Sequence, residues 1–141
     1  MLREWVGDRD AIEFLLSVFS AAEFFDDVID GDVELDKKTA VHVLFDLLVD
    51  LPLNPFFERH KLQLIPIVIV GINAWLDANV LEQGSDNDKA LAYVLRDLYM
   101  ELLSLVVYLT RGQAYLREHS VEMRKFFTQH ESLEEYKRKL Q

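Results

Sequence analysis

The chain has 141 residues and half of them are apolar, so we expect a single domain spanning residues 1–141 with a proper hydrophobic core. Its 25 acidic side chains outnumber 15 basic ones, and the net charge of −10 argues against direct binding to nucleic acid, which needs a basic surface. The absence of cysteine excludes disulfides, thiol catalysis and zinc–thiolate sites.

The N-terminal residues lack the apolar core of a signal peptide, and we find no run of about 18 apolar residues that would span a membrane. We therefore expect a soluble protein of a reducing cytoplasm with no membrane contact. The charge is uneven, because residues 1–60 carry a net −9 and residues 61–141 a net −1. The acidic half is suited to pairing with the other half, within a chain or between chains, or with a basic partner protein.

The first long element is a helix over Asp8–Ile29, with Asp8 as its N-cap. Gly31 follows as a left-handed C-terminal stop. Glu23, Asp26 and Asp30 project from the sector that apolar residues occupy earlier in this helix. An apolar face is thus predicted to become a carboxylate face over the last two turns.

This acidic cluster, defined as Glu23, Asp26, Asp27 and Asp30, is an unfavourable arrangement in isolation. Carboxylates near a helix C-terminus oppose the helix dipole, and like charges three and four residues apart repel. Either the cluster is only a solvated helix end, or a cation compensates it. The cation is Mg²⁺ held by Asp26, Asp27 and Asp30, or a basic side chain from another helix.

A second helix is expected from about Asp36 to Val49, with His42 and Asp46 one turn apart on its polar face. That spacing fits two ligands of a metal ion, and it equally fits the wet face of an amphipathic helix. Leu51 to Pro55 then reads as a connector.

Asn54 as N-cap and Pro55 at the first helical position predict the start of a central apolar helix, about 55–79. Pro66 should kink or restart it. We expect this helix to be buried on nearly all sides, with Gly71 allowing close approach of a neighbour and Asn73 as a buried, bonded amide.

After a loop at residues 79–88, Asp86 or Asn87 is expected to cap a helix that runs to about Tyr108. Asp97, Glu101 and Ser104 form its predicted exposed stripe.

Arg96 points away from that stripe, onto an apolar flank where a guanidinium needs a carboxylate. We therefore expect Arg96 to pair with the acidic cluster, and Lys89 and Arg111 are the alternative cationic partners. The alternative is that Arg96 extends to water.

Gly112 marks a break before a helix at 114–129. The last helix, about 131–140, has few apolar residues, and we expect it to be peripheral, fraying or docking onto a partner. In total the sequence predicts an all-α bundle of five to six helices around the central helix.

Asp26-Asp27-Val28-Ile29-Asp30 is a literal DDxxD, which resembles the aspartate-rich motif of isoprenoid diphosphate synthases. Those enzymes are all-helical and hold diphosphate through Mg²⁺ on two such motifs. The resemblance covers ten to fifteen residues, and no second DDxxD is present here. It implies magnesium as a cofactor and a phosphate or diphosphate as ligand.

Three stretches together resemble a family of small bacteriophage proteins: Phe25-Asp-Asp-Val-Ile-Asp-Gly-Asp, Asp50-Leu-Pro-Leu-Asn-Pro-Phe-Phe and Ala92-Tyr-Val-Leu-Arg-Asp. This resemblance spans most of residues 14–110. It implies a phage or prophage origin and a location in the host cytoplasm or the virion, but no activity.

We find no complete catalytic constellation, glycine-rich phosphate loop or HExxH motif. The leading hypothesis is a non-enzymatic phage accessory protein that acts by protein–protein contact, with another protein or as a homo-oligomer, and without a cofactor. The alternative is a Mg²⁺-dependent phosphate- or diphosphate-binding protein or enzyme, in which Arg96 or Lys89 contacts the phosphate.

Overall fold

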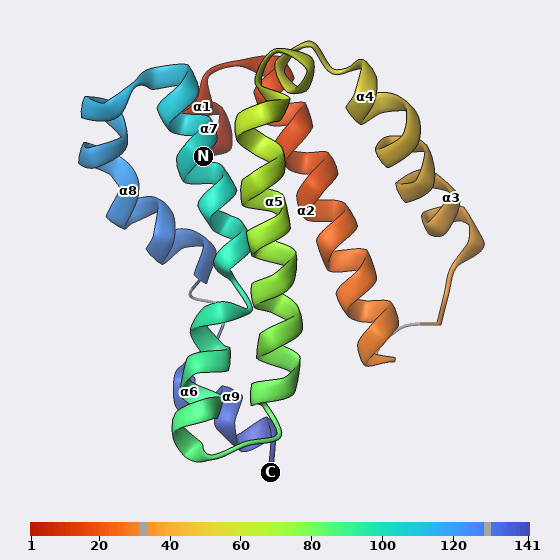
Figure 1. The fold of residues 1–141 in the computed structure, drawn as a ribbon, viewed down its shortest axis with the longest axis vertical. Coiled ribbons are helices and arrows are strands. Elements are labelled where there is room, and N and C mark those ends of the chain that lie inside the picture. Colours follow the sequence, from red (N-terminus) through yellow and green to blue (C-terminus); the bar gives the residue numbers. More distant parts are fainter. Residues whose placement is uncertain (32–33, 129–130) are drawn as a thin grey trace. The chain divides into compact units, whose positions relative to one another are not determined.

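The computed structural model describes residues 1–31, 34–128 and 131–141, and every regular element in these ranges is helical (Figure 1). The expectation of an all-α protein is confirmed. The elements in chain order are α1 (Leu2–Val6), α2 (Arg9–Asp30), α3 (Lys37–Phe45), η1 (Asp46–Asp50), α4 (Leu51–Leu53), α5 (Pro55–Leu81), α6 (Asp86–Leu95), η2 (Leu98–Met100), α7 (Glu101–Arg111), α8 (Gln113–Thr128) and α9 (Leu133–Lys139). They form two compact units, Met1–Lys61 and Leu62–Gln141, each described by itself.

In the first unit, α2 has the predicted caps. The Asp8 carboxylate accepts a hydrogen bond from the backbone N–H of Ala11 at 2.8 Å, which satisfies one of the free donors of the first turn. Gly31 ends the helix at φ 72°, a left-handed conformation that glycine adopts without strain, and donates its N–H to the carbonyl of Asp27.

Asn54 fixes the start of α5 to the start of α2. Its side-chain oxygen accepts a hydrogen bond from the N–H of Phe57 at 2.9 Å, and its amide nitrogen donates to the carbonyl of Asp10 at 2.8 Å. The buried ring of Phe14 lies beside this contact, stacked on Phe57 with ring centroids 5.7 Å apart. The predicted N-cap is therefore also a contact between helices.

α3, η1 and α4 form one helical run from Lys37 to Leu53, in which η1 is a π-helical turn. The N–H of Leu51 bonds to the carbonyl of Asp46, five residues earlier. Pro52 follows within α4, and as a proline it has no N–H to donate to the preceding turn of the run. The predicted connector at Leu51 is therefore wrong for residues 51–53, which continue the helix.

α5 runs from Pro55 to Leu81 with Pro66 inside it, so the predicted central helix at 55–79 is confirmed as an element. The prediction that it is buried on nearly all sides is wrong. Leu64 and Ala78 are fully buried, whereas Leu62 is 84% exposed. The apolar composition of a helix does not determine which of its sides are covered by neighbouring elements.

By length and composition alone, α5 could also cross a membrane, a test that the core helix of a soluble protein passes as well. The expectation of no membrane contact therefore stays a prediction.

In the second unit, the predicted helix at 88–108 is divided into α6, η2 and α7. α6 is capped by Ser85, not by Asp86 or Asn87, in a reciprocal capping box with Asp88. The division falls at Asp97, whose backbone lies at φ −99°, ψ 8°. No glycine or proline marks it, which is why the sequence predicted a single helix.

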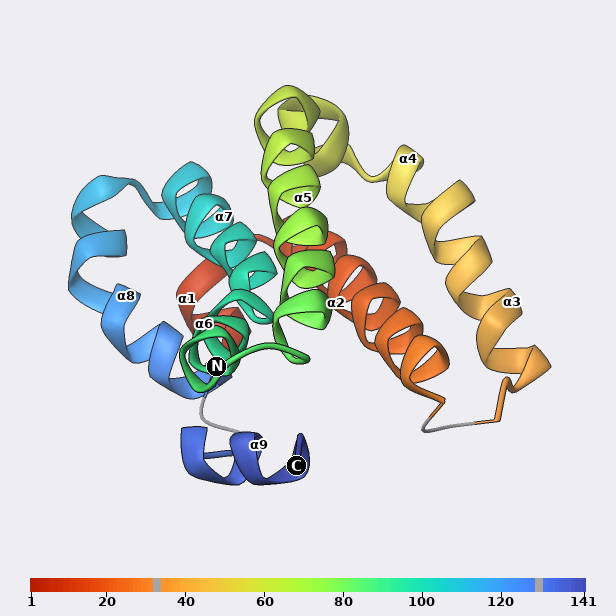
Figure 2. The same ribbon diagram turned by 60° about the horizontal axis from the view of Figure 1, so that its bottom comes forward.

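Gly71 of α5 lies against η2, as its lack of a side chain predicted. A Cβ at this position would lie 3.0 Å from the Cα of Tyr99. α7 then buries Leu102, Leu103, Val106 and Val107 along one face and ends at Gly112 as predicted. It lies beside α8 in both ribbon views (Figures 1 and 2).

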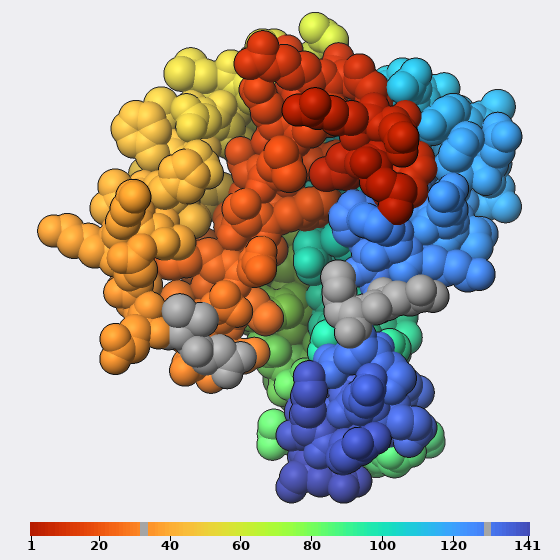
Figure 3. All heavy atoms as spheres, turned by 180° about the vertical axis from the view of Figure 1, so that it is seen from behind, coloured from red at the N-terminus to blue at the C-terminus, as the bar shows by residue number. Residues whose placement is uncertain are grey.

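α9 is docked in its unit, which corrects the expectation of a fraying terminal helix. Tyr136 is buried in a cluster with Ala78 of α5 and Ala92 of α6. Lys137 forms an ion pair with Asp86 at 2.8 Å. Figure 3 shows the dark blue residues of α9 packed against the green residues of the same unit.

Candidate functional site

The acidic cluster lies at the carboxyl end of α2, as predicted. Glu23 and Asp30 are exposed, and Asp26 and Asp27 are half-buried. The last turn of the helix contains no basic residue. The carboxylates therefore face the negative end of the helix dipole without a cation from their own turn.

A metal site at this cluster stays a prediction. Among the described residues, no three His, Asp or Glu side chains lie close enough together to hold a metal ion. Asp32, the next carboxylate of the stretch, lies outside the described residues. A hydrated Mg²⁺ is bound through as few as one or two carboxylates, so the test is made in solution.

His42 and Asp46 face one another along the same helical run. The Nε2 atom of His42 lies 3.5 Å from a carboxylate oxygen of Asp46, and the imidazole is largely exposed. Within the part of the chain that the structure describes, no third metal-ligating side chain joins them. Their geometry is that of an ordinary i, i+4 contact on a wet face.

The carboxylate that the structure places against Arg96 is Glu131. A guanidinium nitrogen lies 3.0 Å from the Oε1 atom of Glu131. The same guanidinium lies over the ring of Tyr136, 4.6 Å from its centroid. Arg96 therefore does have a carboxylate partner, as predicted, but the partner is Glu131 of the same unit. Nothing in the sequence indicated this contact, because 35 positions separate the two residues.

Pairing of Arg96 with Asp26 and Asp30 would join residues of different units and stays a prediction. Lys89, one of the two alternative cationic partners, lies in α6. Arg111, the other, lies in the last turn of α7, with its guanidinium 5.3 Å from the Tyr115 ring centroid.

Glu131 connects α6 to α9. Its Oε2 atom lies 2.7 Å from the Nζ atom of Lys139, opposite the contact with Arg96. The close ammonium of Lys139, partly offset by burial and reinforced by Arg96, holds the pKa of the Glu131 carboxyl below its usual value. The hydroxyl of Tyr93 donates to the backbone carbonyl of Glu131 at 2.6 Å.

Tyr136 completes this network from α9. Its hydroxyl donates a hydrogen bond to Glu82, just beyond the end of α5, and burial together with that bond raises the pKa of the phenol. Ser132-Leu-Glu-Glu135 at the start of α9 is a capping box in the structure. That sequence pattern would have located the helix start, although it says nothing about what the helix contacts. The network is structural in character, since each charge in it has a partner.

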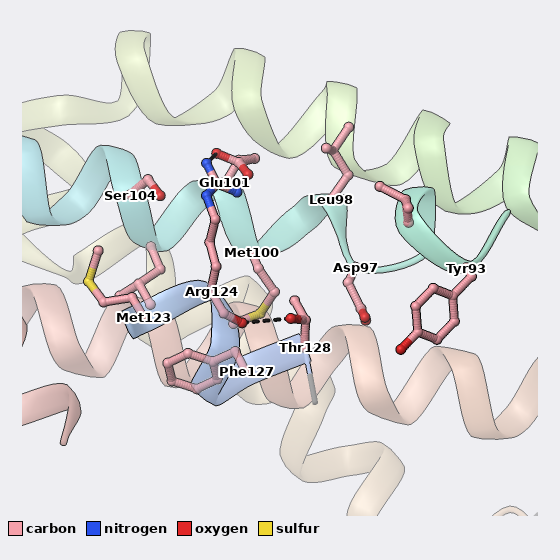
Figure 4. A pocket seen from close by; sticks show the side chains of 12 residues that line it. Tyr93, Asp97, Leu98, Met100, Glu101, Ser104, Met123, Arg124, Phe127 and Thr128 are labelled. Carbon is pink, nitrogen blue, oxygen red and sulfur yellow. Dashed lines mark hydrogen bonds and ion pairs between the residues drawn. The ribbon is translucent and has the colours of Figure 1, made fainter. Parts of the chain in front are cut away.

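A cavity of about 310 Å³ lies within the second unit (Figure 4). Its walls come from the end of α6, η2, α7 and α8. Asp97, Glu101 and Ser104, predicted to form an exposed stripe, are half-buried and line this cavity, so that prediction is wrong. The complete lining is Tyr93, Val94, Asp97, Leu98, Met100, Glu101, Leu103, Ser104, Met123, Arg124, Phe127 and Thr128.

The chemistry of the cavity is mainly apolar. Arg124 extends to Glu101 across one wall in Figure 4, with a hydrogen bond of 2.8 Å from its second nitrogen. Because these two charges neutralise each other, the cavity offers no net cation to a phosphate group. It is suited to apolar groups and not to the diphosphate chemistry that the DDxxD resemblance implies.

The most extensive unusual surface is an apolar stripe on α5, hereafter the α5 stripe. Its members recur at intervals of three and four residues and are all exposed: Leu62, Ile65, Ile69, Ile72, Leu76 and Val80. The opposite side of the same helix carries the buried residues Leu64, Gly71 and Ala78. One side of α5 therefore belongs to the core, and the other is apolar without being buried.

A second exposed apolar surface lies on the helical run of the first unit. Val41, Leu44, Phe45, Leu48 and Leu53 are each more than half exposed. Val43 is the buried residue of this run's first helix. Large apolar side chains exposed in this number along one helical run are uncommon on a monomeric soluble protein.

Comparison of the chain with models of known protein families, with curated proteins and with solved structures finds no significant match.

Proposed function

We propose that this protein acts by protein–protein contact through its exposed apolar helix faces, as an accessory protein of a bacteriophage or prophage. The observation that carries the proposal is the apolar exposure itself. Among the described residues, 23 large apolar side chains are exposed, whereas 18 apolar residues are buried and five of those are alanines. A chain of this length normally buries most of its large apolar side chains, so the excess indicates surfaces that a partner covers.

The charge distribution supports the same proposal. The net charge of −10 keeps such a surface soluble before a partner binds, and it disfavours binding to nucleic acid. The phage origin rests on the resemblance of three sequence stretches to small phage proteins, two of which include parts of α2 and the Asn54-Pro55 helix start.

The test is capture of partners from bacterial lysate by the immobilised protein, together with its molar mass in solution. We expect wild type to recover a stable partner or to form a defined oligomer. Leu44→Lys and Ile69→Lys each place a charge in one exposed apolar surface and should reduce that binding.

Val121→Lys on α8 is the matched control, since Val121 is 58% exposed and Ile69 is 61% exposed. It makes the same change of charge outside both surfaces and should leave binding unchanged. A clean monomer that captures no partner would overturn the proposal.

A further inference from the structure

The α5 stripe has the spacing of a helix–helix seam. Leu62, Ile65, Ile69, Ile72 and Leu76 follow one another at intervals of 3, 4, 3 and 4 residues. This is the repeat that lets two helices pack side chains into each other along their length. Leu62 and Val80 at the two ends of the stripe are 18 residues apart, which is five helical turns or about 27 Å at 1.5 Å per residue.

The stripe is also the least charged exposed part of the chain. No Asp, Glu, Lys or Arg occurs from Leu62 to Leu76, whereas the whole molecule has a net charge of −10. Two copies of this chain repel each other mainly through residues 1–60, which carry a net charge of −9. The α5 stripe is where they can approach without bringing like charges together.

The charges at the ends of the stripe distinguish the two possible directions of pairing. Arg59 and Asp77 are exposed and 18 residues apart, so they lie on the same flank of α5, one near each end. Parallel pairing places the same flank of the two helices on opposite sides of the seam, so Arg59 of one copy stays far from Asp77 of the other. Antiparallel pairing about a twofold axis brings the same flanks together and places each Arg59 near the Asp77 of the other copy.

We infer that the α5 stripe is the interface of a homodimer, in which α5 of one copy packs antiparallel against α5 of a second copy with Ile69 at the twofold axis. This inference rests on the proposed function and names the partner for one of its two surfaces. In this arrangement Leu62 of one copy lies opposite Leu76 of the other. The interface is isologous, so it closes at two copies and does not propagate.

The first test is molar mass by light scattering over a wide range of concentrations. We expect a mass approaching twice 16.5 kDa as concentration rises. Ile69→Lys should weaken association by about thirtyfold or more, as expected for a central interface contact. Val121→Lys should dimerise as wild type does.

Cysteine crosslinking tests the direction, because the natural chain has no cysteine. Under mild oxidation, Ile69→Cys should crosslink to itself. Leu62→Cys and Leu76→Cys should each fail to crosslink alone and should crosslink when mixed. Self-crosslinking of Leu62→Cys would indicate parallel pairing and overturn the antiparallel arrangement.

Other occupants of the stripe give different results. If the stripe is covered by apolar residues of its own chain, wild type stays monomeric at all concentrations. If it is covered by lipid, the protein floats with phosphatidylcholine vesicles and Ile69→Lys does not. Either result overturns the dimer. A monomer that still captures a protein partner leaves the proposed function standing, whereas a monomer that captures none overturns both.

Discussion

At the scale of single residues, Asn54 is the clearest case of one side chain with two structural tasks. It caps α5 through the N–H of Phe57 and binds the carbonyl of Asp10 in α2, and it is nearly fully buried. Both bonds are formed away from water, so loss of either leaves an unsatisfied polar group.

We therefore expect Asn54→Ala to lower the free energy of unfolding by about 2–3 kcal/mol, from the lost cap and the carbonyl left without its donor. Urea denaturation followed by circular dichroism measures the change. Asn54→Asp keeps the acceptor for Phe57 but replaces the donor to Asp10 with a carboxylate oxygen that the Asp10 carbonyl repels, so it should also be less stable than wild type. Full stability of Asn54→Asp would show that the bond to Asp10 contributes nothing.

Glu131 gives a prediction for pH. Its pKa in the folded protein lies below the usual value of 4.5, so the folded state binds its proton less readily than the unfolded chain does. The stabilisation from its pairs with Lys139 and Arg96 is then complete above pH 4.5 and is lost as the pH falls through the lowered pKa.

Glu131→Gln should be less stable than wild type at neutral pH, and this difference should shrink as the pH falls below 4.5. Denaturation midpoints measured from neutral to acidic pH provide the test. A stability difference that stays constant across that range would contradict the assigned role of the charge.

At the scale of elements, the close approach of α5 to η2 depends on Gly71. In an exposed helix, alanine would stabilise by up to about 1 kcal/mol relative to glycine. Here the added Cβ would lie 3.0 Å from the Cα and 3.1 Å from the Cβ of Tyr99, atoms that cannot move without moving the backbone.

We expect Gly71→Ala to lower the free energy of unfolding by about 1–3 kcal/mol because of this overpacking. Asn73→Ala is the control in the same helix, since Asn73 is exposed and donates a hydrogen bond to Asp77 within α5. Its effect should stay within about 0.5 kcal/mol. Stabilisation by Gly71→Ala would mean that the two elements separate freely.

The helix ends that the sequence predicted are those with local signals. Asp8, Gly31 and the Asn54-Pro55 pair act on the backbone within a few residues, so their effect can be read from neighbours in the chain. The division of the helix at Asp97 has no such signal. The burial of Tyr136 and the contact of Glu131 with Arg96 arise only when distant segments meet, so the sequence did not reveal them.

Asn73 shows that the sequence also predicted burial where the structure has none. Its position in an apolar helix predicted a buried amide, but it is exposed and donates a hydrogen bond to Asp77 of its own helix at 3.0 Å. Apolar neighbours along the chain indicate burial only where another element covers that side of the helix.

At the scale of the whole molecule, the acidic cluster distinguishes a protein-binding role from magnesium chemistry. Thermal melting with EDTA, with Mg²⁺, and with Mg²⁺ plus pyrophosphate should leave the midpoint unchanged if the cluster is a helix end facing water or a basic partner. A ligand at a hundred times its dissociation constant would add about 2.7 kcal/mol, which is several degrees in the midpoint.

Asp26→Asn/Asp30→Asn is the paired variant for this measurement. We expect it to be as stable as wild type or more stable, since it removes repulsion between carboxylates near a helix C-terminus. A rise in the wild-type midpoint with Mg²⁺ that the double variant loses would establish the magnesium site instead.

The uncharged stretch of α5 determines how the stability of the dimer should depend on salt concentration. A homodimer formed through residues 62–76 has few interfacial charges to screen, while the two copies together carry twice the net charge of −10. Added salt should therefore strengthen the dimer by damping repulsion between the two bodies. The dissociation constant should fall as salt rises, opposite in direction to the salt response of proteins that bind nucleic acid by charge.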